Sequence, residues 1–158
     1  MSKMSEEEEI QAIRLKKEKE ILEKMAGPPE NEMPSELIHI NTAEEFNSLV
    51  EKYQDKVIVI DFWADWCAPC KMFGPIFEAA QKEWNSEYIF AKLDTERLPN
   101  IAQALNVMGI PMLLFIRGKT EVHRQSGALR KNQFNKLLQQ VKIALEKRGK
   151  QQEGTMYS

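Results

Sequence analysis

The sequence predicts an α/β fold in which a mixed β-sheet is flanked by helices, with one further helix preceding the domain. Short apolar runs alternate along the chain with longer segments whose apolar residues recur at helical spacing, the pattern of a layered α/β domain. The run from Val57 to Trp63 is almost wholly apolar and β-branched, as expected for a strand covered on both faces. With 158 residues, the chain suits one such domain with extra segments at its ends.

The first expected element is a charged helix from Ser5 to Ala26. Ser5 and Glu8 form a capping-box pattern, and the four glutamates 6–9 suit the positive end of a helix dipole. A linker with three prolines ends this segment at residue 34, so residues 1–34 form the first unit. The apolar face is too broad and irregular for a coiled coil, which favours a solvated helix and a monomer. Docking on the domain, pairing with a second copy and recruitment of a partner stay open. The apolar residues are Ile10, Ile13, Leu15, Ile21, Leu22 and Met25.

The compact domain is expected over residues 35–148, and apolar periodicity together with turn residues places its elements. A second capping box, Thr42 with Glu45, opens its first helix. Residues 149–158 are polar and are expected to form a disordered tail. The predicted elements are a strand Leu37–Ile40, a helix to Tyr53, a strand Val57–Trp63, a helix Ala68–Trp84, a strand Tyr88–Leu93, a helix Leu98–Leu105, a hairpin of Met112–Ile116 and Thr120–Arg124, and a helix Lys131–Lys147.

Composition excludes several classes of function. The net charge of -2 gives no electrostatic footprint for nucleic acid. No apolar stretch approaches the ~20 residues that span a bilayer, so no membrane role is expected. The acidic residues 6–9 are unlike a secretory signal, and the chain has only two cysteines. We therefore expect a cytoplasmic protein, since structural disulfides are rare there.

Both cysteines fall in one hexapeptide, Trp66-Cys67-Ala68-Pro69-Cys70-Lys71. A disulfide between them closes too small a ring to staple a fold, because its stabilising effect grows with loop length. The pair lies between a predicted strand and a predicted helix, where Cys-x-x-Cys is typical of a redox motif. The alternative is half of a zinc site, but zinc needs four ligands and only His39 and His123 could add to the pair. We expect no metal.

Asp61 and Lys92 each interrupt an otherwise apolar predicted strand. Burial of a carboxylate is costly, so we expect the pKa of Asp61 to be raised. The alternative is a strand-end aspartate that reaches water. If the two strands are neighbours, Lys92 can approach Asp61 beneath the thiols.

Three separated motifs resemble those of the thioredoxin family. Residues 61–71, Asp-Phe-Trp-Ala-Asp-Trp-Cys-Ala-Pro-Cys-Lys, are similar to its active-site stretch. Gly109-Ile110-Pro111 is similar to its cis-proline loop, and Gly127-Ala128 to its third substrate-facing loop. The resemblance covers Leu37 to Leu145 with matching element order, and it implies the thioredoxin fold.

The resemblance implies a thiol-disulfide oxidoreductase that reduces disulfides in substrate proteins and is regenerated by a thioredoxin reductase, with no cofactor beyond the Cys67–Cys70 disulfide. Cys67 would be the attacking nucleophile, since the start of a helix favours an anion, and the more covered Cys70 would resolve the mixed disulfide. Asp61 would assist proton transfer, with Lys92 as a modulator. The residues expected to contact substrate are Trp66, Ala68, Pro69, Gly109, Ile110, Pro111, Gly127 and Ala128.

The chain departs from the family at two positions: Ala68 stands where glycine is usual, and Met112 stands where threonine is usual. The alternative function is a binding or chaperone module that recruits partners through the first helix. An oxidase or isomerase is disfavoured by the absence of histidine between the two cysteines.

Overall fold

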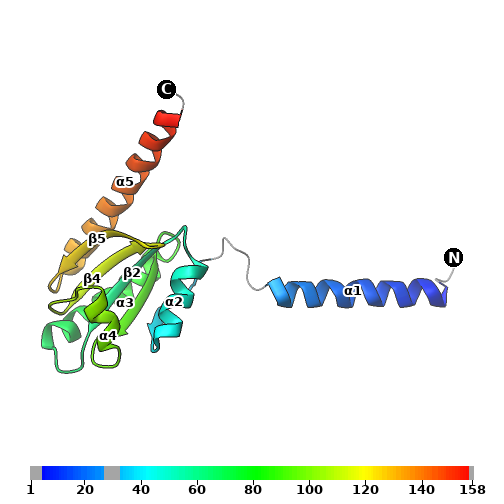
Figure 1. Cartoon of the computed structure of the whole chain (residues 1–158), viewed down its shortest axis with the longest axis horizontal. Coiled ribbons are helices and arrows are strands. Elements are labelled where there is room, and N and C mark those ends of the chain that lie inside the picture. Colours follow the sequence, from blue (N-terminus) through cyan, green and yellow to red (C-terminus); the bar gives the residue numbers. More distant parts are fainter. Residues whose placement is uncertain (1–4, 27–32, 157–158) are drawn as a thin grey trace. The chain divides into compact units, whose positions relative to one another are not determined.

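The computed structural model describes residues 5–26 and 33–156 (Figure 1). The chain separates into two compact units, Met1–Glu32 and Met33–Ser158. The domain boundaries expected after residues 34 and 148 stay predictions.

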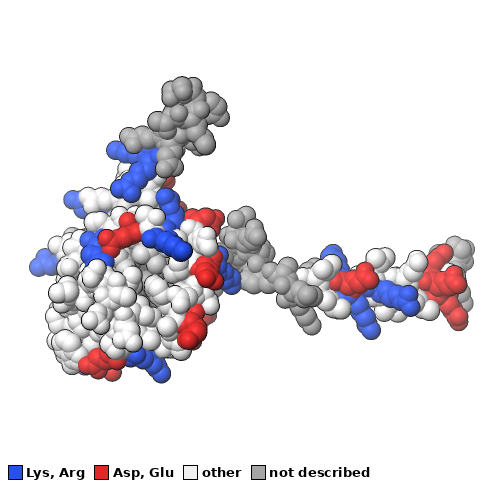
Figure 2. All heavy atoms as spheres, viewed as in Figure 1, with Lys and Arg blue, Asp and Glu red and all other residues white. Residues whose placement is uncertain are grey.

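The first unit contains α1, Glu6–Ala26. Its start is capped as predicted, because the Glu8 backbone N–H donates to Ser5 Oγ at 3.3 Å. Figure 2 shows acidic side chains gathered at the start of this helix and side chains of both signs beyond it. Its described large apolar side chains are exposed: Ile10, Ile13, Leu15, Ile21 and Leu22.

The second unit is built on a five-stranded sheet with the order β1-β3-β2-β4-β5. β1 and β2 both run parallel to β3, whereas β4 runs antiparallel to β2 and to β5, so the predicted mixed sheet is confirmed. The strands are β1 Ile38–Ile40, β2 Val57–Trp63, β3 Ile89–Asp94, β4 Met112–Arg117 and β5 Thr120–Ser126. Each strand boundary lies within two residues of its prediction.

Four helices accompany this sheet: α2 Ala43–Lys52, α3 Ala68–Trp84, α4 Pro99–Ala104 and α5 Lys131–Met156. The predicted cap of α2 is present, because Thr42 Oγ1 accepts from the Glu45 backbone N–H at 3.0 Å. The return contact of Glu45 falls one residue earlier than in a standard capping box, on the backbone N–H of Asn41.

Two apolar layers sandwich the sheet. Alternation along β2 sends Ile58, Ile60 and Phe62 toward α2 and α4, and Val57 and Val59 toward α3 and α5. Asp61 lies on the same face of β2 as Val57 and Val59, toward α3 and α5. The layer beneath α3 and α5 is rich in aromatic rings, most of which pack edge-to-face or tilted, while Phe77 and Phe134 are stacked. Its fully buried aromatic residues are Phe73, Phe77, Tyr88, Phe90, Phe115 and Phe134.

The predicted end of the last helix is wrong. Helix α5 continues to Met156, through residues that were expected to be a disordered tail. The expectation rested on the polarity of these residues. The two glycines among them, Gly149 and Gly154, each cost only about 1 kcal/mol relative to alanine inside a helix. Lys150, Gln151 and Gln152, between the two glycines, are good helix formers, so the helix continues.

We predict that the aromatic layer is the main source of the domain's stability. Phe134→Ala removes a fully buried ring from α5 and should lower the free energy of unfolding by about 3–5 kcal/mol. Ile143→Ala, at a half-exposed position of the same helix, should change it by less than about 0.5 kcal/mol. Urea unfolding of the two variants measures both values. Equal effects would contradict the assignment of this core.

Candidate active site

Cys67 occupies the junction between the central strand and α3. Its backbone N–H donates to the Ala64 carbonyl at 3.2 Å, which turns the chain sharply after β2. Cys67 is the extended N-cap residue of α3, and its Sγ accepts from the Cys70 backbone N–H at 3.3 Å. The first amides of a helix have no partner within the helix and carry partial positive charge. This position favours the thiolate of Cys67 over its thiol.

The two cysteines are joined in a disulfide, as the redox motif predicts. Cys67 is 4% exposed and Cys70 is 3% exposed, so both sulfurs are covered in the disulfide state and the expected difference in their exposure is small. The bond draws both sulfurs into one small cluster with Ala64, against which Trp63 and Ile110 pack.

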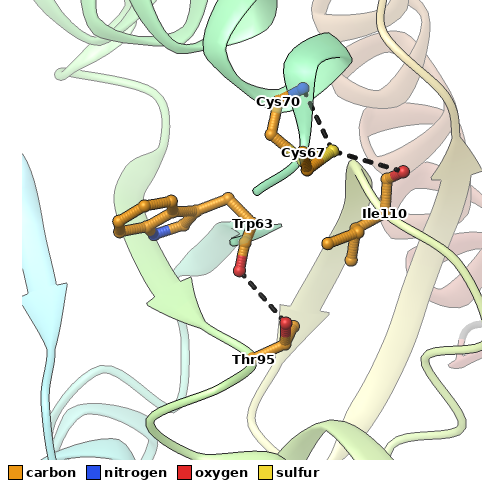
Figure 3. The surroundings of a disulfide bond; sticks show 5 residues. All are labelled: Trp63, Cys67, Cys70, Thr95 and Ile110. Carbon is orange, nitrogen blue, oxygen red and sulfur yellow. Dashed lines mark hydrogen bonds between the residues drawn. A yellow bond between two sulfur atoms is a disulfide. The ribbon is translucent and has the colours of Figure 1, made fainter. Parts of the chain in front are cut away.

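The loop before β4 faces the disulfide. The Ile110–Pro111 peptide bond is cis, as the resemblance implied. The Ile110 carbonyl oxygen lies 3.8 Å from Cys67 Sγ (Figure 3). In the disulfide this is a close contact without a proton, and in the reduced protein the Cys67 thiol can donate across it. The Pro111 carbonyl is already occupied, since it accepts from the Gly127 backbone N–H at 2.9 Å.

Asp61 is fully buried on the α3 side of β2. Neither of its carboxylate oxygens has a hydrogen-bond partner in the protein. Burial raises the pKa of Asp61 from 3.8 to about 7, and the positive charge of Lys92 opposes this rise. The prediction of a raised pKa is confirmed, and the alternative of a strand-end aspartate that reaches water is wrong.

Lys92 lies directly opposite Asp61 in the β2–β3 register, so the two strands are neighbours as proposed. Its Nζ lies 5.0 Å from the centre of the Trp63 ring and 3.7 Å from the place where a Cβ of Gly74 would stand. The ion pairs among the described residues do not include Asp61 or Lys92. Lys92 therefore influences Asp61 through space.

An exposed rim surrounds the covered sulfurs. Trp66 is 69% exposed, so it is a surface residue, whereas Trp63 packs against the cysteine cluster. Figure 2 shows few charged side chains over α4 and the neighbouring sheet in the face it presents. Five predicted substrate contacts are also exposed, and Pro111 is buried behind them; the exposed ones are Ala68, Pro69, Gly109, Gly127 and Ala128.

The sequence did not single out four residues of this region. Met72, which follows the cysteine pair in the sequence, is 73% exposed. Met108, which precedes Gly109, is 93% exposed. Their position outside the apolar periodicity is the signal that could have found them. Thr95 donates to the Trp63 carbonyl through its backbone N–H at 2.9 Å and its Oγ1 at 3.2 Å (Figure 3). Arg124 binds carbonyls at the end of α4, a contact between distant segments that periodicity does not reveal.

The histidines do not complete a metal site with the cysteines. His39 lies on β1 and His123 on β5, the two opposite edge strands of the sheet. In the part of the chain that the structure describes, no group of three or more histidine, cysteine or acidic side chains is arranged to hold a metal ion. Nor is any helix of that part both long and apolar enough to cross a membrane.

Comparison with known proteins agrees with this geometry. The family model described as thioredoxin matches residues 37–140. The chain is 41% identical over 108 residues to thioredoxin C-3 of Corynebacterium nephridii, covering 68% of this chain and 72% of that protein. It is 44% identical over 88 residues to putative thioredoxin 2 of Streptomyces coelicolor, covering 56% of this chain and 63% of that protein.

A solved structure, the thioredoxin NaTrxh from Nicotiana alata, superposes with a TM-score of 0.62 at 30% identity, covering 69% of this chain and 95% of that one. The sheet order, the cysteine pair at the start of α3 and the cis-proline loop thus occur together with a family match over most of the domain. The chain belongs to the thioredoxin family and carries that family's redox-active pair of cysteines, the pair of a protein-disulfide oxidoreductase, at Cys67 and Cys70.

Proposed function

We propose that this protein reduces disulfides in other proteins, with Cys67 as the nucleophile and Cys70 as the resolving thiol. The position of Cys67 Sγ carries this proposal: it accepts an amide N–H at the start of α3 and faces the Ile110 carbonyl. Among the residues that the structure describes, no amide N–H donates to the Cys70 sulfur, which supports the unequal roles. A thiolate is the attacking species in disulfide exchange.

The reaction runs through a mixed disulfide. The Cys67 thiolate forms a bond to one substrate sulfur, the substrate disulfide breaks, and the other substrate sulfur leaves as a thiolate that takes up a proton. Cys70 then loses its proton and attacks Cys67 Sγ, which releases the second substrate sulfur as a thiolate that also takes up a proton. Of the two protons gained, one comes from Cys70 and the other from solvent. The substrate gains two electrons and two protons, and the protein ends as the Cys67–Cys70 disulfide.

Asp61 is the proposed proton acceptor for Cys70. A buried carboxylate whose pKa is about 7 is half protonated near neutral pH, so it can take up and return a proton there. Its oxygens have no hydrogen-bond partner in the protein, which leaves both free for this exchange. Lys92 modulates the reaction, since its charge favours the ionised form of Asp61.

The exposed rim is the proposed substrate contact. The Ile110 backbone lies beside Cys67, where an extended substrate segment can pair with it as an added strand. Trp66 offers a large aromatic surface at the same edge. The remaining proposed contacts are Ala68, Pro69, Gly109, Pro111, Gly127 and Ala128.

We also propose the setting in which this reaction occurs. A thioredoxin reductase restores the dithiol, and the protein then passes these electrons on to its substrates. The protein acts as a monomer. The cytoplasm is the proposed location, because a chain whose only two cysteines form the redox pair suits a reducing compartment.

The two cysteine variants test the function. Cys67→Ser should abolish insulin reduction with dithiothreitol, because the nucleophile is lost. Cys70→Ser should still attack but should accumulate a covalent complex that added thiol releases, visible on a non-reducing gel. Activity that persists in Cys67→Ser would rule out the proposal and favour the binding module.

The proton-transfer role predicts a kinetic effect confined to resolution. Asp61→Asn should slow the Cys70 step on the order of 10²-fold and remove a rate increase centred near pH 7. Single-turnover quenching measures the lifetime of the mixed disulfide. In a Cys70→Ser background, Asp61→Asn should leave the initial attack unchanged. A resolving step as fast and as pH-dependent as in the parent would remove Asp61 from the mechanism.

The same carboxyl makes stability depend on pH. Between pH 3.8 and about 7 the folded protein holds this proton while the unfolded chain releases it, so unfolding becomes easier as pH rises. At about 1.4 kcal/mol for each pH unit, the full effect is roughly 4 kcal/mol. Asp61→Asn should therefore gain stability relative to the parent between pH 4 and pH 8, measured by urea unfolding. Asp65→Asn, an exposed change in the following loop, should show no such gain. Parallel pH curves for the parent and Asp61→Asn would contradict the burial argument.

A further inference from the structure

We propose that Arg124 of β5 is a positioning residue that holds the loop 107–111 against Cys67 and thereby sets the KM for protein substrates. The second half of this statement rests on the substrate role proposed above for Ile110. The side-chain hydrogen bonds of Arg124 go to Glu121, Leu105 and Asn106 and not to a cysteine, so Arg124 acts through the loop.

Arg124 binds the chain where α4 gives way to this loop. Its Nη1 donates to the Asn106 carbonyl at 2.9 Å, and its Nη2 donates to the Leu105 carbonyl at 2.6 Å. Asn106 has a φ of 56°, a left-handed backbone that turns the chain away from the helix. Arg124 is therefore hydrogen-bonded to the turn at which the loop begins.

These two carbonyls follow a helix end in which three carbonyls already have backbone partners. The Ile101 carbonyl accepts from Leu105, the Ala102 carbonyl from Val107 and the Gln103 carbonyl from Asn106. Carbonyls at and just beyond a helix end need partners from outside the helix, and those of Leu105 and Asn106 find them in one guanidinium group. Removal of Arg124 leaves them without this partner.

Glu121 fixes the plane of the guanidinium. Its Oε1 accepts from Arg124 Nε at 2.8 Å and from Nη2 at 2.6 Å. The Arg124 side chain is 29% exposed and that of Glu121 is 50% exposed, so this ion pair adds little stability by itself. Its effect is orientation, because a planar guanidinium held on one side presents its other N–H groups in a fixed direction.

Gly127, the residue directly after β5, holds the far end of the loop. The Gly127 backbone N–H donates to the Pro111 carbonyl at 2.9 Å, and Gly127 has a φ of 89°, which favours glycine. Between the two anchors lie Met108, which is 93% exposed, and Ile110, whose carbonyl is 3.8 Å from Cys67 Sγ. Release of the first anchor therefore displaces Ile110 without altering the amide at the Cys67 sulfur.

The test compares Arg124→Met with Arg117→Met. The first keeps the long side chain and removes the donors, and the second makes the same change at an exposed position at the far end of β4. Arg124→Met should raise the KM for insulin about three- to tenfold, the size expected for one or two lost hydrogen bonds. It should leave kcat and the reaction with a small aromatic disulfide unchanged, since that reagent needs only Cys67. Arg117→Met should change none of these.

Amide hydrogen exchange separates the two steps of the proposal. Exchange at residues 107–110 should accelerate several-fold in Arg124→Met, while exchange along β2 and α3 stays as in the parent. Arg124→Lys, which keeps the charge but loses the fork of donors, should give an intermediate result. Unchanged exchange in the loop overturns the proposal at its first step and leaves the Ile110 pairing untouched. A loosened loop with an unchanged KM overturns it at its second step and contradicts the Ile110 pairing as well.

Discussion

The capped start of α3 is the interaction on which the site depends. A nucleophilic sulfur at neutral pH needs stabilisation of its negative charge, and here the Cys70 amide supplies it to Cys67 Sγ. That geometry exists because the central strand ends at Trp63 and the Ala64 carbonyl turns the chain directly into a helix. Thr95 secures the same point through two hydrogen bonds to the Trp63 carbonyl. The sheet therefore places the sulfur, and the helix makes it reactive.

Burial of Asp61 opposes stability and serves the chemistry. The interior strand position would favour an apolar residue, and a carboxylate without hydrogen bonds there destabilises the fold wherever it is ionised. Five buried phenylalanines on the same side of the sheet offset that destabilisation. Lys92 lies opposite Asp61 but forms no ion pair with it, so its charge lowers the pKa of Asp61 without holding the carboxyl in its ionised form. A tight ion pair would hold the carboxylate ionised and remove its use as a proton carrier.

Local patterns predicted most of the domain because its strands and helices are locally consistent. The β-branched strand, the capping residues of α1 and α2 and the charged pair Asp61 and Lys92 each carry their own signal in the sequence. The end of α5 was missed because the residues from Gly149 on are polar, yet polar residues and two glycines weaken a helix without ending it. The contact of Arg124 with Leu105 was missed because it joins two segments whose proximity exists only in the folded sheet.

Different elements of the site determine the reactivity of the sulfur and the placement of the loop that faces it. The sulfur chemistry belongs to β2, β3 and α3, which carry the cysteines, Asp61 and Lys92. The placement of the facing loop belongs to β5, an edge strand that contributes no reacting atom. An edge strand can change its side chains without disturbing the layered core, since only one of its borders is paired. Substitutions on β5 can therefore alter which proteins dock beside Cys67 while the reactivity of the sulfur, fixed by the helix start, stays the same.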